Sequence, residues 1–105
     1  MVYKKSGGTK MAVTMDVRMP SEAAQLYEPL NRELGVHKDK LPDGLLHHFA
    51  TMTKDGFNIF EVWESQEAFD RFANDRLLPA LKKLGGAQAS QIQPTFGELH
   101  NEFHS

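Results

Sequence analysis

The chain has 105 residues, a length that fits one domain, and its 40% hydrophobic and 25% charged residues are typical of a soluble globular protein. A net charge of −2 without a basic block argues against nucleic-acid binding, and the absence of cysteine excludes disulfides, thiolate metal sites and cysteine nucleophiles. The sequence has no apolar run of the ~20 residues that a membrane span needs and no secretory signal pattern, so we expect a cytoplasmic protein without membrane partners.

A flexible lead-in followed by a strand is the first prediction along the chain. Residues 1–10 contain Lys, Ser and Gly and offer little to bury, so we expect a flexible N-terminal segment and a single domain over 11–105. Residues 11–19 alternate strictly between apolar and polar side chains. This alternation predicts a strand, which Pro20 ends.

A first helix is predicted over 22–34, where apolar residues recur with the spacing of one helical face, at Ala23, Leu26, Tyr27, Leu30 and Leu34. Ser21 is its expected N-cap, and Gly35 is its expected end. Pro29 removes one backbone hydrogen bond inside this run, so we expect a kink there.

Two strands and a second helix follow. The strands are predicted over 45–53 and 57–64, and the KDG sequence between them indicates a tight hairpin turn. Ser65 is a good N-cap for a helix over 66–84, which Pro79 should kink. A last strand covers roughly 90–100.

The order β-α-β-β-α-β is the ferredoxin-like α+β arrangement, in which both helices lie on one face of a four-stranded antiparallel sheet. The strand at 57–64 is nevertheless apolar on both sides, with Phe57, Ile59 and Trp63 on one and Phe60 and Val62 on the other. A sheet face in water would not carry such residues. We therefore expect a second copy of the chain to cover this face, forming a homodimeric α+β barrel.

The stretch DGFNIFEVWESQEAFDRFANDRLLPAL resembles the antibiotic-biosynthesis-monooxygenase-like (ABM-like) branch of the dimeric α+β barrel superfamily. PDGLLHHFA upstream and LHN at 99–101 are similar to features of a bacterial subgroup of that branch. The resemblance covers roughly residues 11–103. The superfamily includes cofactor-independent oxygenases, haem-degrading enzymes, polyketide cyclases and lactone isomerases, so the resemblance implies the fold more narrowly than the reaction.

The register of the hairpin decides which polar groups share a face. If Asp55 and Gly56 form the turn, His48 lies opposite Trp63 and on the same face as Glu61. A four-residue loop keeps these faces, whereas a three-residue loop would place His48 on the opposite face. The resemblance implies that His48, Glu61 and Trp63 share the cavity face, because the tryptophan of VWES lines a cavity in haem-degrading relatives.

On that choice, His48 and Glu61 are candidate catalytic residues, and the candidate substrate-binding residues are Trp63, His100, Phe57 and Met52. Imidazole titrates near neutral pH, and a His–Glu pair can deprotonate a phenol or an enol. A tryptophan can stack on an aromatic ring. We therefore predict a cofactor-independent monooxygenase, cyclase or isomerase that acts on an aromatic or polyketide-like compound.

The alternative is a non-catalytic small-ligand-binding or structural dimer, in which His48 and Glu61 are a satisfied polar pair and Trp63 is a packing anchor. The adjacent His47 and His48 do not predict a metal site, because neighbours on a strand point to opposite faces. Haem binding is a third hypothesis. Haem enzymes of the superfamily use a helix histidine, which residues 66–84 lack, so no cofactor is predicted.

Overall fold

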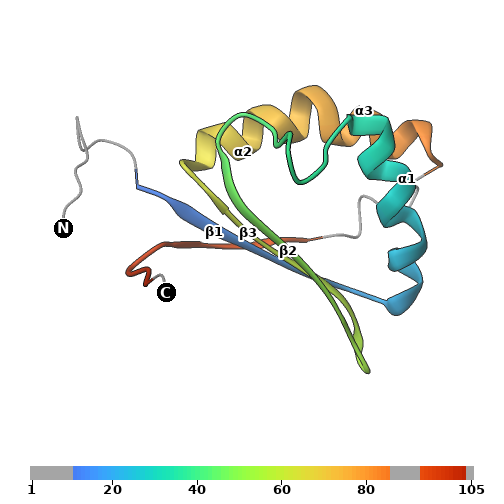
Figure 1. The fold of residues 1–105 in the computed structure, drawn as a ribbon, viewed down its shortest axis with the longest axis horizontal. Helices are drawn as coiled ribbons and strands as arrows, with labels where there is room; N and C mark the ends of the chain where they lie inside the picture. The colour runs from blue at the N-terminus through green and yellow to red at the C-terminus, as the bar shows by residue number, and fades with distance from the viewer. Residues whose placement is uncertain (1–10, 86–92, 104–105) are drawn as a thin grey trace.

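The computed structural model describes residues 11–85 and 93–103, which form a four-stranded antiparallel sheet with helices on one face (Figure 1). The strands are β1 (Val13–Met19), β2 (Leu45–Thr53), β3 (Gly56–Trp63) and β4 (Thr95–Glu98). The helices are a 3₁₀ turn (Ser21–Ala23), α1 (Ala24–Leu34), α2 (Gln66–Phe72), a π-helical segment (Ala73–Leu77) and α3 (Leu78–Lys83). The strand order β2-β3-β1-β4 confirms the ferredoxin-like prediction.

Two predictions concern residues near the ends of the chain, some of which lie outside the described ranges. The expected flexible segment 1–10 lies outside the described residues, as do residues 90–92 of the predicted last strand. The described part of that strand is shorter than predicted, because β4 covers only Thr95–Glu98. No helix in the described ranges has the length and apolar character needed to cross a bilayer.

The hairpin turn lies one residue earlier than predicted. Thr53 pairs with Gly56, so Lys54 and Asp55 form the turn instead of Asp55 and Gly56. Gly56 is needed in the strand itself, because its φ is 155° and a Cβ there would run into the carbonyl oxygen of Met19 on β1. Relative to the register of an Asp55–Gly56 turn, each cross-strand partner moves by two residues, so the expected faces are correct.

The first helix starts differently from its prediction. Ser21 makes no side-chain cap bond within the described chain, and the N–H of Ala23 donates to the carbonyl of Pro20 at 2.9 Å in a 3₁₀ turn. The helix end is as predicted, since Gly35 has a left-handed φ of 69°. Pro29 lies inside α1, which continues to Leu34.

The second helical region begins as predicted but is interrupted. Ser65 accepts a hydrogen bond from the N–H of Ala68 at 3.1 Å, which confirms the N-cap. A π-helical turn at Ala73–Leu77 separates α2 from α3, and Pro79 is the second residue of α3. Proline lacks an N–H and its ring crowds the carbonyl four residues earlier. The wider π turn accommodates this conflict in the region where a kink at Pro79 was predicted.

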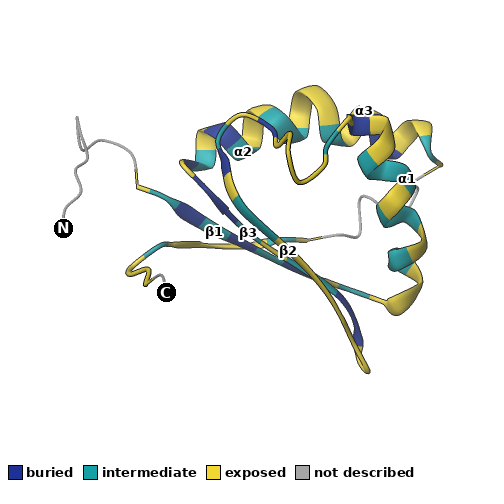
Figure 2. Ribbon diagram, in the orientation of Figure 1, coloured by how far each residue is buried: buried dark blue, intermediate teal, exposed yellow. Residues whose placement is uncertain are grey.

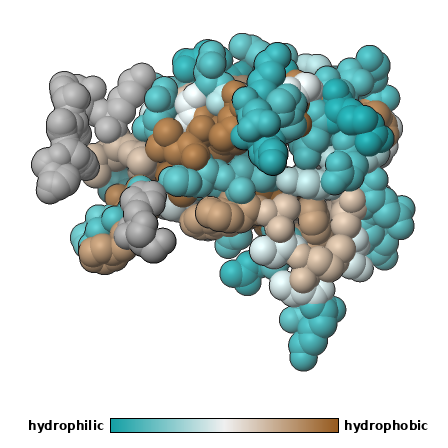
Figure 3. Space-filling view, in the orientation of Figure 1, coloured by the Kyte–Doolittle hydropathy of each residue, from teal (hydrophilic) through white to brown (hydrophobic). Residues whose placement is uncertain are grey.

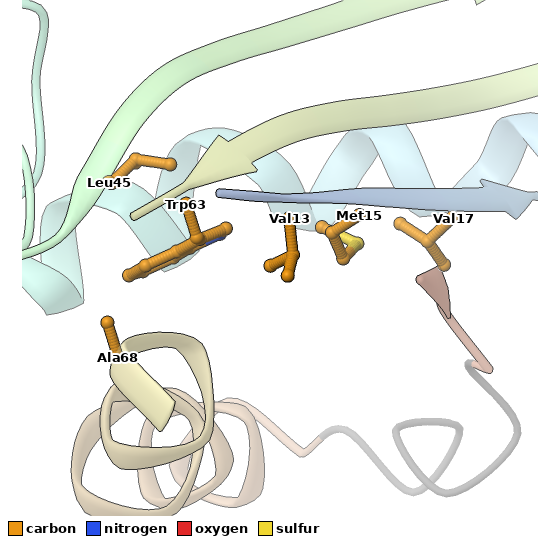
Figure 4. Packing of buried hydrophobic residues seen from close by; sticks show 6 residues of the cluster. All are labelled: Val13, Met15, Val17, Leu45, Trp63 and Ala68. Atoms are coloured by element: carbon orange, nitrogen blue, oxygen red, sulfur yellow. The ribbon is translucent and has the colours of Figure 1, made fainter. Parts of the chain in front are cut away.

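The core lies between the sheet and α2, with Trp63 at its centre (Figure 4). Trp63 is fully buried, and its ring contacts Phe69 and Phe72 with centroid distances of 5.5 Å in both cases. In Figure 4 the side chains of Val13, Met15 and Val17 lie in a row along β1, on the side of the strand that faces α2. Burial of this size makes Trp63 a major contributor to stability, since removing a core tryptophan side chain costs about 3–5 kcal/mol.

The opposite face of the sheet carries exposed apolar side chains. Phe49 of β2 is 55% exposed, Phe60 of β3 is 40% exposed, and their rings lie 6.4 Å apart. No helix of the described chain covers this side, which faces away from α1 to α3 in Figures 1 and 2. Hydrophobic residues are visible below the level of the helices in the space-filling view (Figure 3). The prediction that β3 is apolar on both faces is confirmed.

Candidate functional site

A cavity of ≈ 280 Å³ lies between the sheet and the helices. Its walls are mainly apolar and come from β1, α1, α2 and the π-helical segment, through side chains such as Met15, Val17, Leu30, Phe72 and Leu77. The polar side chains that line it are Tyr27, Asn31, His48 and Glu61. A mostly apolar hollow with a few converging polar groups is the usual form of a small-molecule site, and this one is close to the smaller end of the ~300–1,000 Å³ range.

A chain of three hydrogen bonds joins the polar groups of this cavity to the core. The indole Nε1–H of Trp63 donates to Oε1 of Glu61 at 2.8 Å. The other carboxyl oxygen, Oε2, lies 2.6 Å from Nδ1 of His48. The remaining ring nitrogen of His48, Nε2, lies 2.6 Å from the hydroxyl oxygen of Tyr27. The chain therefore runs Trp63–Glu61–His48–Tyr27.

These contacts assign donors and acceptors when Glu61 is ionised and His48 is neutral. A carboxylate can only accept hydrogen bonds, so Nδ1 of His48 must carry the proton that faces Glu61. In a neutral imidazole Nε2 is then an acceptor, and the hydroxyl of Tyr27 donates to it. The Glu61 side chain is 12% exposed and that of His48 is 25% exposed, so the carboxylate is the more deeply buried member of the pair.

Secondary structure holds each group in place. His48 and Glu61 are direct partners across β2 and β3, and Trp63 follows Glu61 by two residues on the same face. Tyr27 comes from α1, and its ring stacks on His48 with a centroid distance of 5.8 Å and an interplanar angle of 16°. Phe57 packs edge-on against the ring of Tyr27, with a centroid distance of 5.3 Å.

A β-bulge in β2 also shapes the site. Leu45 pairs with Trp63, but the next regular pair is His47 with Val62, so Leu46 is an extra residue in the strand. Leu45 and His48 are three positions apart and would face opposite sides of a regular strand. Because of the bulge, both line the cavity.

The structure brings some of the predicted site residues to the cavity. His48 and Glu61 line it, in the predicted facial arrangement. Trp63 and Phe57 lie immediately behind these groups, since Trp63 is fully buried and bonded to Glu61 and Phe57 packs against Tyr27. Neither side chain lines the cavity, so their direct contact with a substrate has no support in the geometry.

Two further predicted residues lie elsewhere. Met52 is on the correct face but near the hairpin tip, and it is 58% exposed instead of lining the cavity. His100 follows β4, is exposed, and does not line the cavity. His47 points to the opposite side of the sheet from His48, and its Nε2 lies 2.9 Å from Oε2 of Glu102.

Tyr27 and Asn31 line the cavity but were not among the residues predicted for the site. Tyr27 was part of the apolar stripe of the first helix, and Asn31 follows it by one turn. The hydroxyl group of Tyr27 within this apolar stripe could have indicated a site residue, because a buried phenol usually finds a hydrogen-bond partner. Among the described residues, no group of three or more His, Asp and Glu side chains is arranged to hold a metal ion.

Comparison with known proteins supports the fold. The chain matches no protein-family model and no curated protein sequence. It is similar in structure to a conserved protein from Methanosarcina mazei Go1, with a TM-score of 0.62, 13% identity, and coverage of 85% of this chain and 93% of that one. It is also similar to a candidate antibiotic biosynthesis monooxygenase from Caulobacter crescentus CB15, with a TM-score of 0.64, 15% identity, and coverage of 88% and 92%.

A third similar structure is SnoaB, a cofactor-independent oxygenase from Streptomyces nogalater, with a TM-score of 0.48, 15% identity, and coverage of 90% and 93%. Identities this low speak to the arrangement of the chain and not to its chemistry. The first two similarities establish the ferredoxin-like α+β fold, in agreement with the fold expected from the β3–α2 sequence.

Proposed function

We propose that this chain, which has the fold of ABM-like members of the dimeric α+β barrel superfamily, is a cofactor-independent enzyme. It acts on an aromatic or polyketide-like compound bound in the cavity beside the sheet. The observation that carries the proposal is the hydrogen-bonded set of Tyr27, His48 and Glu61 at the wall of an otherwise apolar cavity.

The reaction begins with removal of a proton from a phenol or enol. His48 takes up the proton at Nε2, and Glu61 stabilises the resulting imidazolium across the 2.6 Å contact at Nδ1. The indole of Trp63 keeps the carboxylate in this position. A carbanion or enolate formed in this way is the species from which cyclisation, isomerisation or reaction with molecular oxygen can follow.

The character of the cavity fits an aromatic or polyketide-like compound. Its apolar walls, which include Phe69 and Phe72, favour planar hydrocarbon surface and disfavour ligands with a permanent charge. The carboxylate of Glu61 also lies at the wall, and it would repel an anionic ligand.

A non-catalytic small-ligand-binding protein is the second candidate. The same cavity favours it over a purely structural dimer, because a structural core would fill this space with side chains. The two candidates differ in whether His48 changes the chemical state of the ligand. An enzyme loses turnover without this histidine, whereas a binding protein keeps its ligand.

We also propose that the protein is a homodimer, with a second copy covering the exposed face of the sheet. Exposed Phe49 and Phe60 give this face the apolar character of a buried interface. A two-fold pair would place the same patch of each copy against the other.

The proposal is tested by native mass spectrometry with a panel of phenols, naphthols and cyclic 1,3-diketones. A cavity-filling variant, Ala73→Phe, changes a lining residue of the π-helical segment and should abolish binding. Asn74→Phe adds a larger side chain at the next, exposed position and should leave binding intact. Equal binding by wild type and Ala73→Phe would place the ligand outside this cavity and contradict the proposal.

A further inference from the structure

We infer that Tyr27, and not His48, is the residue that meets the acidic hydroxyl of the ligand, and that the proton passes through Tyr27 to His48. The inference rests on the proposed function, because it assigns the route of the proton within the same cavity. It also narrows the ligand to a neutral, weakly acidic O–H compound, such as a phenol or an enol.

The starting observation is that both ring nitrogens of His48 are already engaged. Nδ1 lies 2.6 Å from Glu61, and Nε2 lies 2.6 Å from the hydroxyl of Tyr27. The ring of Tyr27 also stacks on the imidazole at a 16° angle. A ligand in the cavity therefore forms a hydrogen bond to Nε2 of His48 only if Tyr27 moves away.

Tyr27 is better placed to receive the ligand. It lines the cavity, and its hydroxyl oxygen keeps acceptor capacity after its proton is donated to His48. Phe57 holds the ring from the edge at 5.3 Å, so a hydrogen bond and two ring contacts restrain the phenol. A restrained hydroxyl with one open lone pair suits a ligand that donates an O–H.

The ligand proton can then be transferred to Tyr27 while the proton of Tyr27 is transferred to His48. The ligand O–H proton goes to the oxygen of Tyr27 while the Tyr27 proton goes to Nε2 of His48. One O–H bond of the ligand breaks, the O–H bond of Tyr27 is exchanged, and one N–H bond forms. The products are a ligand oxyanion, a neutral Tyr27 that now donates to it, and an imidazolium paired with Glu61.

This route selects the class of ligand. In the resting state the oxygen of Tyr27 is an acceptor, so it favours a neutral O–H donor over a carboxylate. The apolar walls add to this preference, because they disfavour a ligand that arrives charged. Negative charge develops on the ligand only next to Tyr27, whose hydroxyl becomes a donor to it in the same step.

The test uses 4-nitrophenol, whose phenol and phenolate absorb at different wavelengths, and nitrobenzene, which has the same ring without the hydroxyl. Spectra are recorded at a pH where the free probe is mainly the phenol. We expect wild type to bind 4-nitrophenol more tightly than nitrobenzene and to show the phenolate band for the bound probe. Tyr27→Phe should lose about three- to tenfold of that preference, the scale of one hydrogen bond, together with the phenolate band.

Two control variants complete the test. His48→Gln should bind the probe only as the phenol, because the final proton acceptor is gone. His47→Gln makes the same change on the other face of β2 and should behave as wild type. Circular dichroism and a thermal unfolding curve establish that each variant is folded.

The outcomes separate the two claims. If neither probe binds to wild type, the proposed function and the inference both fail. If wild type and Tyr27→Phe show the same phenolate band and His48→Gln does not, His48 acts directly and only the role of Tyr27 is wrong. As a measurement independent of any ligand, ¹⁵N chemical shifts of the His48 imidazole in the wild type should show a protonated Nδ1 and an acceptor Nε2 at neutral pH. The reverse tautomer would overturn the relay.

Discussion

His48 and Glu61 meet because they are direct cross-strand partners, with Nδ1 of the imidazole 2.6 Å from a carboxylate oxygen. The pairing follows from the two-residue turn between β2 and β3, because the register is regular from the Thr53–Gly56 pair to the His47–Val62 pair, so local geometry places both groups. The contact has consequences for catalysis and for stability that can be measured separately.

Replacing His48 with glutamine should reduce turnover by about a hundredfold or more, the usual contribution of a positioned acid–base group. Glutamine is similar in shape and keeps hydrogen-bonding capacity, but it does not titrate near neutral pH. Turnover is measured with whichever compound the binding panel identifies, alongside the His47→Gln control. Unchanged turnover, together with a stability loss of about 1–3 kcal/mol, would instead indicate a residue that serves only the fold.

Replacing Glu61 with glutamine should destabilise the protein by about 1–3 kcal/mol. The two carboxylate oxygens each accept one hydrogen bond, from Trp63 and from His48. An amide offers one accepting oxygen and a donating NH₂ group, so with Nδ1 of His48 protonated one of these donors faces another donor. The free energy of unfolding in urea measures the effect, and the exposed Glu64→Gln is the matched control. Equal stabilities for the two variants would show that the carboxylate is not needed by both partners.

The sequence was sufficient for the faces of the hairpin but not for its partners. Side chains alternate with a period of two, so a turn placed wrongly by one residue moves each partner by two and leaves His48 and Glu61 on one face. The position of Gly56 was misread as part of the turn, because the carbonyl of Met19 that excludes a Cβ there belongs to another strand. Such a contact has no local signal in the sequence.

The role of Tyr27 and the bulge at Leu46 could not be predicted from the sequence either, for a related reason. The helical stripe of the first helix predicted that Tyr27 faces the sheet, which is correct, but not that its hydroxyl meets a histidine 21 positions later. Leu46 looks like an ordinary strand residue in LLHHFATMT. Both features depend on how elements pack against each other. The period of each element was readable, whereas the contacts between elements were not.

Gly56→Ala should destabilise the protein by more than about 1 kcal/mol, because the native backbone and the nearby Met19 carbonyl are incompatible with a Cβ. Gly35→Ala is the informative comparison. Gly35 also has a positive φ, but a Cβ there meets nothing within 4 Å, so the cost is conformational alone. Thermal or urea unfolding should rank Gly56→Ala as the less stable of the two. The opposite ranking would mean that the β1–β3 approach adjusts easily.

Introducing a charge at Phe60 should disrupt the proposed dimer. Phe60 is 40% exposed on the face of the sheet that lies away from the helices, and it packs near Phe49. A glutamate there would bury a charge without a partner in the interface, which costs several kcal/mol unless the copies separate. Light scattering at micromolar concentration should therefore give the mass of two chains for wild type and of one chain for Phe60→Glu. Leu41 is also 40% exposed but lies in the loop before β2, so Leu41→Glu should remain a dimer. A wild-type mass of one chain under these conditions would rule out the dimer and leave the apolar side of β3 without an explanation.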